Sequence, residues 1–197
     1  MMAVVFDPVR TALLMIDMQM GFIDARSSLC IVGAAASVPA CRVALEAARG
    51  AGMPIVHVRR EYAADGSDVE PVRRRIWEEG GRPLSAAWPE SLMPPAGLEP
   101  LAGEEILVKP RFSAFFGTGL HGWLQARGIG GLVLIGTTTP NCIRSTCYDA
   151  LSLNYDVAVV ADATSSRSPE VQRANLEDMR FIGATVCAAS ELRGMMA

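Results

Sequence analysis

Short apolar runs alternate along the chain with longer segments in which apolar residues recur at helical spacing. The runs are rich in aliphatic and β-branched residues and are bounded by Gly, Pro or charged residues, which predicts buried strands. They cover 11–17, 54–59, 105–108, 130–136, 156–162 and 184–188. The segments 37–52, 118–128, 140–154 and 169–183 carry the apolar stripe of amphipathic helices. This alternation predicts a doubly wound, mainly parallel α/β sheet of about six strands with helices on both faces, a Rossmann-like three-layer architecture.

The segment 63–103 breaks the pattern. It holds Pro71, Pro83, Pro89, Pro94, Pro95 and Pro100 together with Trp77 and Trp88. Because a long irregular connection inside a compact domain is usually functional or part of an interface, we predict a Pro/Trp-rich loop segment here. With 197 residues and no internal repeat, the chain fits a single domain over 1–197.

Composition narrows the function classes. The formal net charge is −3, which gives no bulk attraction to nucleic acid or anionic lipid, and no apolar run approaches the roughly 18 residues of a membrane span. We therefore expect no nucleic-acid or membrane partner. The five cysteines are odd in number and irregularly spaced, which favours free thiols in a reducing compartment and predicts a cytoplasmic protein.

The sequence motifs give little indication of a metal or a dinucleotide cofactor. With only His57 and His121, a zinc site built on several imidazoles is nearly impossible. The stretch "GTGLHG" (117–122) matches the dinucleotide-binding glycine pattern, but it neither follows a strand directly nor opens a first βα unit. We expect neither a metal nor another cofactor.

An acid, an amine and a thiol follow three of the predicted strands. Asp17 comes after the first, Lys109 after the third, and Cys142 shortly after the fourth. Ligands of open α/β sheets bind outside the carboxyl ends of the strands, so these side chains are expected on one edge. Each also has a structural interpretation, as a turn cap, a surface cation and a buried small residue. Lys109 is the only lysine among 18 Lys and Arg residues. This favours a specific role for its amine, but it also fits a sequence-wide preference for arginine.

The surroundings of Cys142 add a chemical argument. Thr139 fits a helix N-cap and Pro140 the first helical position, which places Cys142 in the first turn. Unpaired backbone N–H groups and the positive end of the helix dipole are expected to lower the thiol pKa and to supply donors for an oxyanion. Lys109, lying between Asp17 and Cys142, would hold the carboxylate in place and favour the thiolate.

Three stretches together carry a resemblance to a known superfamily. The chain resembles the isochorismatase-like cysteine hydrolases, which include nicotinamidase, N-carbamoylsarcosine amidohydrolase, ureidoacrylate amidohydrolase and biuret hydrolase. The stretches are "ALLMIDMQMGF" (12–22), "VKPRFSAFFGTGL" (108–120) and "LVLIGTTTPNCIRSTCYDALSLNYDVAVVADATSS" (132–166). The resemblance implies a catalytic triad of Asp17, Lys109 and Cys142. It also implies a cis peptide bond between Thr137 and Thr138, and an oxyanion hole formed by the N–H groups of Thr138 and Cys142.

Departures from the family pattern narrow the expected activity. Met20 and Gly21 replace an Asn-Asp pair that the family often carries after the first strand. Nicotinamidases carry metal-binding histidines after the second strand, whereas here one histidine, His57, lies inside that strand. The stretches "KPRFSAF" and "CIRST" are more similar to the ureido- and carbamoyl-amide branch, that of N-carbamoylsarcosine and ureidoacrylate amidohydrolases.

The sequence therefore predicts an amidohydrolase that cleaves a non-peptide C–N bond of a small linear amide, ureido or carbamoyl compound through a thioester on Cys142. Candidates for the substrate pocket are Gln19, Phe22, Phe112, Phe115 and Asn141, while Arg59 or Arg111 either binds a substrate carboxylate or forms a structural ion pair. The resemblance implies a homo-oligomer, a dimer or tetramer. The alternatives are a nicotinamidase-like amidase, a non-catalytic α/β binding protein and a redox-sensing thiol protein.

Overall fold

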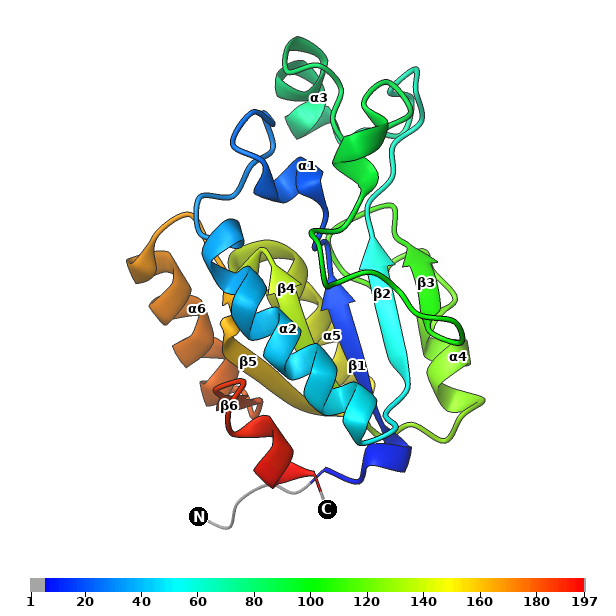
Figure 1. The fold of residues 1–197 in the computed structure, drawn as a ribbon, viewed down its shortest axis with the longest axis vertical. Helices are drawn as coiled ribbons and strands as arrows, with labels where there is room; N and C mark the ends of the chain where they lie inside the picture. The colour runs from blue at the N-terminus through cyan, green and yellow to red at the C-terminus, as the bar shows by residue number, and fades with distance from the viewer. Residues whose placement is uncertain (1–5, 197) are drawn as a thin grey trace.

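A single six-stranded sheet forms the centre of the molecule (Figure 1) in a computed structural model that describes residues 6–196. The strands are β1 (Thr11–Ile16), β2 (Ile55–Arg59), β3 (Glu105–Val108), β4 (Gly131–Thr137), β5 (Asp156–Ser165) and β6 (Thr185–Cys187). Neighbouring strands run parallel in the order β3-β2-β1-β4-β5-β6. The order reverses between β1 and β4, as in doubly wound folds, so the fold class predicted from the sequence is confirmed.

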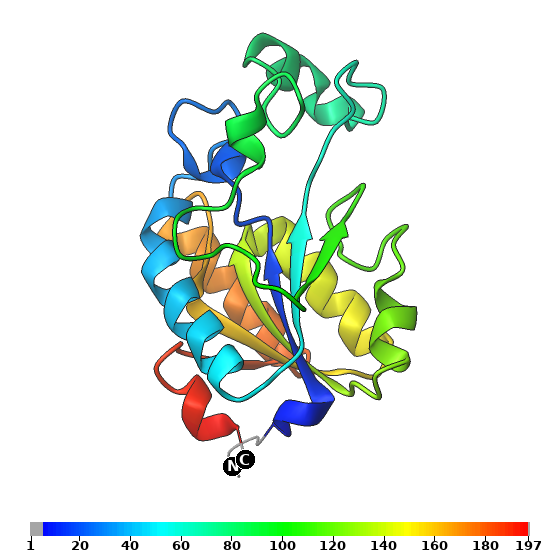
Figure 2. The ribbon, with the colours of Figure 1, turned by 45° about the vertical axis from the view of Figure 1, so that its right-hand side comes forward.

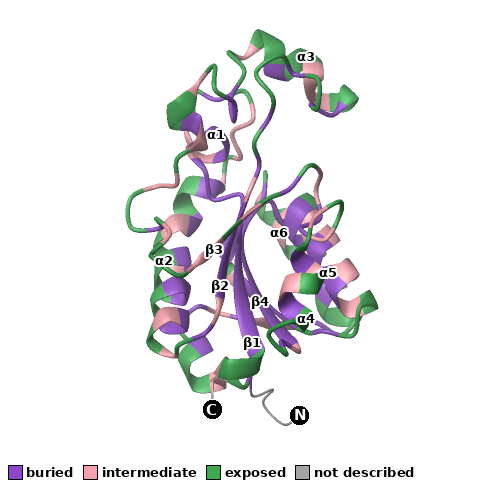
Figure 3. Ribbon diagram, turned by 90° about the vertical axis from the view of Figure 1, so that its right-hand side faces the viewer, coloured by how far each residue is buried: buried purple, intermediate pink, exposed green. Residues whose placement is uncertain are grey.

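Helices cover both faces of the sheet (Figures 2 and 3). The helices of the described residues are α1 (Met20–Ile23), α2 (Ala34–Gly50), α3 (Pro71–Glu79), α4 (Leu120–Gln125), α5 (Arg144–Ser152) and α6 (Pro169–Phe181), with short helical turns η1 (Pro8–Arg10), η2 (Pro89–Leu92), η3 (Thr139–Ile143) and η4 (Leu192–Met195). One face packs against α2 and η4, and the other against α4, α5 and α6. Within residues 6–196, no helix combines the length and the apolar character needed to cross a bilayer.

Alternate residues of β1 supply two separate cores. Leu13 and Met15 face α2, whereas Leu14 and Ile16 face the core that contains Cys142. This division follows from the two-residue period of a strand. Every residue of β1 and β4 is buried, which explains why these strands read as uninterrupted apolar runs (Figure 3).

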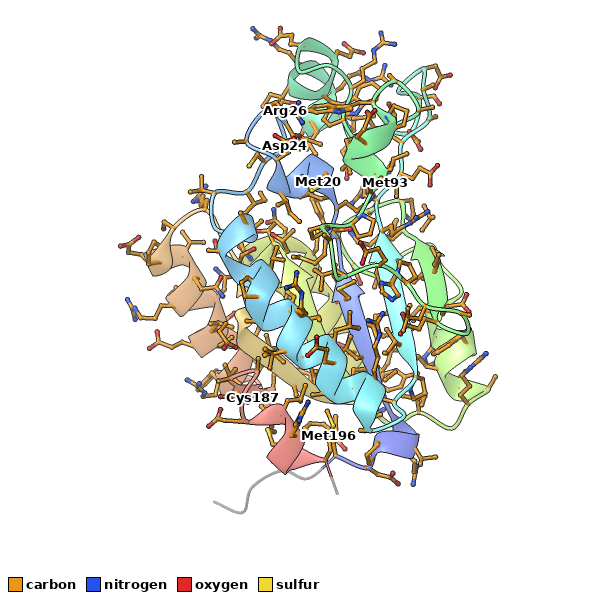
Figure 4. The ribbon with its side chains drawn as sticks, in the orientation of Figure 1. Met20, Asp24, Arg26, Met93, Cys187 and Met196 are labelled. Atoms are coloured by element: carbon orange, nitrogen blue, oxygen red, sulfur yellow. The ribbon has the colours of Figure 1, made fainter. Side chains whose placement is uncertain are left out.

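The segment 63–103 contains helices as well as loops, so the prediction of a loop segment was incomplete. We call α1, α3, η2 and the connecting residues 80–88 the cap; it stands beyond the carboxyl ends of the strands (Figures 1 and 2). The cap has its own core, formed by Phe22, Tyr62, Val69, Trp77 and Leu84. Figure 4 labels Met20 and Met93, whose backbone hydrogen bond of 2.8 Å joins α1 to the chain after η2.

Candidate active site

The ends of three strands position Asp17, Lys109 and Cys142. The Asp17 N–H donates to the Val58 carbonyl at 2.8 Å, and the Lys109 N–H donates to the Arg59 carbonyl at 2.9 Å. These bonds extend the parallel ladder one residue beyond β1 and β3, and so fix where each side chain leaves the sheet. Cys142 lies in η3, directly after β4. The carboxyl edge of the sheet therefore brings the three predicted residues together.

The Lys109 ammonium lies between the other two side chains. Its Nζ is 2.8 Å from Asp17 Oδ2 and 3.5 Å from Cys142 Sγ, and it donates a third contact of 3.0 Å to the Arg111 carbonyl. Lys109 Nζ thus donates two hydrogen bonds, to Cys142 and to the Arg111 carbonyl, and forms an ion pair with Asp17. The exposed fractions of Asp17, Lys109 and Cys142 are 0%, 0% and 1%. All three groups are thus closed off from solvent in this state.

The ion pair with Lys109 engages one oxygen of the Asp17 carboxylate, and the other oxygen lacks a hydrogen-bond donor in the described part of the chain. The contact between Asp17 Oδ2 and Lys109 Nζ is an ion pair whose angles fall outside hydrogen-bond geometry, and Oδ1 has no hydrogen-bond partner among residues 6–196. Burying a carboxylate oxygen without a hydrogen-bond donor costs folding free energy, so such an atom calls for a functional explanation. Oδ1 is therefore available to accept a proton.

The enclosed Cys142 thiol holds its proton at neutral pH. Its pKa is raised to about 11, with burial as the largest cause; the Asp17 charge adds to the rise, and the charges of Lys109 and Arg60 oppose it. The prediction of a lowered thiol pKa is thus wrong for this closed state, although the Lys109 charge does act in the predicted direction. The desolvation cost of a thiolate outweighs the two cations.

The backbone before Cys142 differs in detail from the predicted helix start. Thr138, not Thr139, is the N-cap residue, and η3 is a π-helical segment that α5 continues. Segments of this kind are frequent at functional sites. The Thr137–Thr138 peptide bond is cis, as the resemblance implied. The hydroxyls of Thr138 and Thr139 both donate to the Ser165 carbonyl, at 3.2 and 3.0 Å, which fixes the segment against β5.

Two of the predicted pocket residues serve neighbouring parts of the structure. Gln19 exchanges two hydrogen bonds with the Arg60 backbone, at 2.8 and 2.9 Å, and so ties the end of β1 to the end of β2. Phe22 belongs to the same cap core as Trp77 and not to the core that contains Cys142. Phe112 is partly buried against the core of Cys142, as a pocket wall would be.

The remaining candidates differ in their surroundings. Phe115 is also packed against the core of Cys142 and stacks on Tyr155 with ring centres 5.9 Å apart, whereas Asn141 is exposed. Arg59 lies 3.7 Å from the Glu61 carboxylate, and Arg111 donates to the Asp68 carbonyl at 3.0 Å. Both arginines thus make the structural contacts that the sequence left open as an alternative.

Arg60 is a functional candidate that the sequence analysis missed. Its side chain is completely buried, and its Nη1 donates to Glu70 Oε1 at 2.5 Å and to the Pro110 carbonyl at 2.7 Å. Glu70 also accepts a hydrogen bond of 2.7 Å from the Tyr62 hydroxyl. The available signal was the doublet of Arg59 and Arg60 at a strand end. Successive residues of a strand point to opposite faces of the sheet, so the two arginines are expected in different surroundings.

Metal ligands do not gather in the described part of the chain. Among residues 6–196, no group of three or more His, Cys, Asp or Glu side chains could hold a metal ion. His57, the histidine of β2, instead lies with its Nε2 2.6 Å from Glu104 Oε2.

Comparison with known proteins agrees with this fold. The model of the isochorismatase domain matches residues 11–191. A probable inactive nicotinamidase of Arabidopsis thaliana is 41% identical over 179 residues, with 88% of this chain and 89% of the relative covered. A ureidoacrylate amidohydrolase of Cronobacter turicensis is 32% identical over 186 residues, covering 85% of this chain and 79% of that protein.

A solved structure shares the arrangement of elements. The N-carbamoylsarcosine amidase of Thermoplasma acidophilum superimposes with a TM-score of 0.75 at 32% identity, over 92% of this chain and 98% of that one. The match of the family model over nearly the whole chain decides the assignment. The chain belongs to the isochorismatase family of hydrolases.

Proposed function

We propose that this protein is a cysteine-dependent amidohydrolase that cleaves a C–N bond of a small linear amide, ureido or carbamoyl compound through a thioester on Cys142. The observation that carries the proposal is the contact chain from Asp17 through Lys109 to Cys142, with distances of 2.8 and 3.5 Å inside a site closed to water. An acid, a fixed cation and a nucleophile within contact distance are the parts that acyl transfer requires.

The first half of the reaction forms the acyl-enzyme. Asp17 accepts the Sγ proton as the sulfur attacks the carbonyl carbon, so that proton removal and attack occur together. This coupling is needed because the resting thiol has a pKa raised to about 11. The C=O electrons move to the oxygen, and the N–H groups of Thr138 and Cys142 stabilise the oxyanion. Collapse breaks the C–N bond, and Asp17 returns the proton to the leaving ammonia or amine.

The second half hydrolyses the thioester. Asp17 is again an unprotonated carboxylate and accepts a proton from the attacking water, the C–S bond breaks, and the sulfur takes the proton back. Throughout, Lys109 keeps its charge and holds the Asp17 carboxylate against the thiol. A lysine suits this position because its ammonium is a compact point charge, whereas a planar guanidinium could not meet Asp17, Cys142 and the Arg111 carbonyl from one atom.

Two relatives support a ureido or carbamoyl substrate. One is named for ureidoacrylate and the other for N-carbamoylsarcosine, and each is 32% identical to this chain. With such a substrate, a bond would form between the carbonyl carbon and Cys142 Sγ and the bond from that carbon to one nitrogen would break. The acyl-enzyme would then be a thiocarbamate ester. The nicotinamidase alternative receives less support, because the relative that carries that name is described as probably inactive.

The same relative also supports a second candidate function. A protein that is 41% identical and named as inactive favours a non-catalytic binding protein as the second candidate. The contacts among Asp17, Lys109 and Cys142 argue for catalysis, since a buried ion pair beside a thiol is an expensive arrangement for a structural core. Turnover of any amide decides between the two.

The experiment is an ammonia-release screen with linear ureido acids, carbamoyl amines, biuret, nicotinamide and cyclic amides. We expect release from one of the ureido or carbamoyl compounds and none with Cys142→Ala. Cys147→Ala is the matched control, because Cys147 lies on the same helical run but in the core behind the site. Absence of turnover across the panel would favour the binding protein, and full activity of Cys142→Ala would end the proposal of a cysteine mechanism.

Assembly, domain organisation and location complete the proposal. We propose a single hydrolase domain over 1–197 that acts as a cytoplasmic homo-oligomer. All five cysteines are free, as a reducing compartment would require. On the edge strand β3, Ile106 and Val108 expose about half of their side chains, which is suitable for contact with a second copy. Sedimentation equilibrium measures the oligomeric state, and a monomer at all concentrations would contradict the proposed assembly.

A further inference from the structure

The buried guanidinium of Arg60 leaves one edge without a partner. Its exposed fraction is 0%, and both of its hydrogen bonds come from Nη1. Neither Nε nor Nη2 has a hydrogen-bond partner among residues 6–196. Nε and Nη2 form one side of the planar group, and their N–H bonds are spaced to meet the two oxygens of one carboxylate. The vacant edge is therefore the edge that recognises carboxylates.

The same region carries a surplus of positive charge. Arg60 and Arg73 share a single carboxylate, that of Glu70, at 2.5 and 3.9 Å. Lys109 is matched by Asp17 alone, so three cations face two anions. The remaining contacts of Arg73 are with uncharged groups, the Tyr62 hydroxyl and the face of a phenylalanine ring, so they do not neutralise its charge. One additional anion would balance the group.

The chain segment after β3 places Arg60 next to the proposed catalytic residues. Arg60 Nη1 donates to the Pro110 carbonyl at 2.7 Å, and Lys109 Nζ donates to the adjacent Arg111 carbonyl at 3.0 Å. The next residue, Phe112, lies 4.9 Å beneath the Arg73 guanidinium. Three consecutive residues thus connect the two arginines to Lys109. In addition, the Arg60 charge is one of those that lower the pKa of the Cys142 thiol.

We propose that Nε and Nη2 of Arg60 bind a carboxylate of the substrate, so that the enzyme prefers a ureido or carbamoyl acid over its uncharged analogue. In naming a substrate class, the inference rests on the function proposed above. It places the carboxylate on Arg60 rather than on Arg59 or Arg111, the arginines considered from the sequence. Arg60 is completely buried and contacts the segment that carries Lys109, whereas the Arg59 side chain is 31% exposed beside Glu61 and Arg111 donates to the Asp68 carbonyl. A carboxylate held by Arg60 would orient the scissile carbonyl relative to Cys142 and would satisfy the vacant guanidinium edge.

A direct test uses two alkylating reagents and needs no turnover. The same thiolate displaces iodide from iodoacetate and from iodoacetamide, and the two reagents differ in carrying a carboxylate or a neutral amide. The ratio of their rates at Cys142, divided by the same ratio for glutathione, measures attraction of the site for a carboxylate. We expect this normalised ratio to exceed about 10 in the wild-type protein and to fall roughly 10-fold or more in Arg60→Gln. Arg59→Gln, at the neighbouring position, is the matched control and is expected to keep the wild-type ratio.

A second variant separates charge from geometry. Arg60→Lys retains a cation but loses the two-donor edge, so its ratio should lie between those of the wild type and Arg60→Gln. If Arg60→Gln fails to fold, Arg60→Lys and the wild-type ratio still test the proposal. A normalised wild-type ratio near 1 would overturn it. Equal loss of both alkylation rates in folded Arg60→Gln would also overturn it, because Arg60 would then act only on the thiolate.

Hydrolysis provides the kinetic counterpart. For a ureido acid and its methyl ester, Arg60→Gln should raise KM and lower kcat/KM of the acid roughly 10- to 100-fold, while changing the ester less than about 3-fold. A parallel loss for acid and ester would refute carboxylate recognition. The two proposals fail in distinguishable ways. A carboxylate-dependent alkylation ratio without any ammonia release would retain the carboxylate site and overturn the amidohydrolase function.

Discussion

Lys109 Nζ lies 2.8 Å from Asp17 Oδ2, and neither side chain reaches solvent. The two charges act on the Cys142 thiol in opposite directions, since Asp17 raises its pKa and Lys109 lowers it. Burial adds to the effect of Asp17, so the proton stays on sulfur in the enclosed state. Burial is the largest cause of the raised pKa, and the two charges of the pair modulate it in opposite directions.

Opposite substitutions in this pair should shift the thiol titration in opposite directions. We expect Asp17→Asn to lower the pKa of Cys142 and Lys109→Met to raise it, because each removes one of the two charges. The measurement is the rate of iodoacetamide alkylation of Cys142 against pH. Both variants should lose hydrolysis by at least about 10³-fold, since each removes a part of the acyl-transfer machinery. Shifts in the same direction would contradict the arrangement.

The same variants should be strongly destabilised. Removing one member of a buried ion pair leaves an uncompensated charge, at a cost of about 3–5 kcal/mol in the free energy of unfolding. The double variant Asp17→Asn/Lys109→Met leaves no such charge, so it should be less destabilised than the sum of the single variants. Urea unfolding of the four proteins gives the coupling energy. Additive effects would mean that the pair is not coupled.

A second, partly buried charge cluster predicts pH-dependent stability. Burial of the Glu104 carboxyl would by itself raise its pKa, but hydrogen bonds from Arg49, the Leu101 N–H and His57 lower it to about 2. Because this value lies below the usual 4.5, the stabilisation is complete above about pH 4.5 and is lost as the pH falls toward 2.

Comparison of Glu104→Gln with the wild type tests this linkage. The difference in the free energy of unfolding should be constant above about pH 5 and should shrink between pH 4.5 and 2. Glu46→Gln, on the exposed side of α2, is the control and should show little difference at any pH. A gap between Glu104→Gln and the wild type that persists to pH 2 would show that the carboxylate charge is not the stabilising element.

The cap core should respond to loss of one side chain. Trp77 is completely buried, and its Nε1 donates to the Pro83 carbonyl at 2.7 Å, whereas the adjacent Ile76 is half exposed. We expect Trp77→Ala to cost about 3–5 kcal/mol locally and Ile76→Ala less than about 1. Hydrogen exchange should show faster opening of the cap only in Trp77→Ala. Equal exchange in both variants would mean that this core does not hold the cap.

A pair of glycines tests how closely β1 and β4 approach beside Asp17. Gly136 and Gly183 both have φ of +114°, but a Cβ on Gly136 would lie 2.0 Å from the Ile16 carbonyl, whereas nothing lies within 4 Å of one on Gly183. Both alanine variants share the backbone cost of this φ. Only Gly136→Ala must also push the strands apart, so it should be far less stable and inactive. Similar melting temperatures for the two variants would contradict this account.

The sheet could be predicted because its strands are buried on both faces. The run "EILV" gave β3 at its observed bounds, and the other five strands differ from their predicted runs mainly at the ends. Helix α3 could not be predicted in this way. Trp77 is its only buried residue, so Pro71–Glu79 shows no apolar stripe at helical spacing. Its position depends on contacts with residues distant in the sequence, which a local pattern does not contain.

The candidate site could be predicted where the topology alone decides the position. Asp17 and Lys109 follow strands, so the parallel sheet brought them to one edge. Arg60 was missed because its importance depends on burial beneath the cap. Phe22 was assigned to the pocket, whereas in the structure it packs in the cap core. The pKa of Cys142 was predicted in the wrong direction for a related reason. A helix start is visible in the sequence, whereas the degree of enclosure is not.

The covalent intermediate tests the central claim most directly. Wild-type protein turning over a ureido or carbamoyl substrate would be quenched in acid within milliseconds, digested and examined by mass spectrometry. We predict an acyl adduct on the peptide that contains Cys142, sensitive to hydroxylamine, with no adduct on the peptide of Cys187, which lies on β6 at the far edge of the sheet (Figure 4). Undiminished turnover by Cys142→Ala, or an adduct on another residue, would contradict the account.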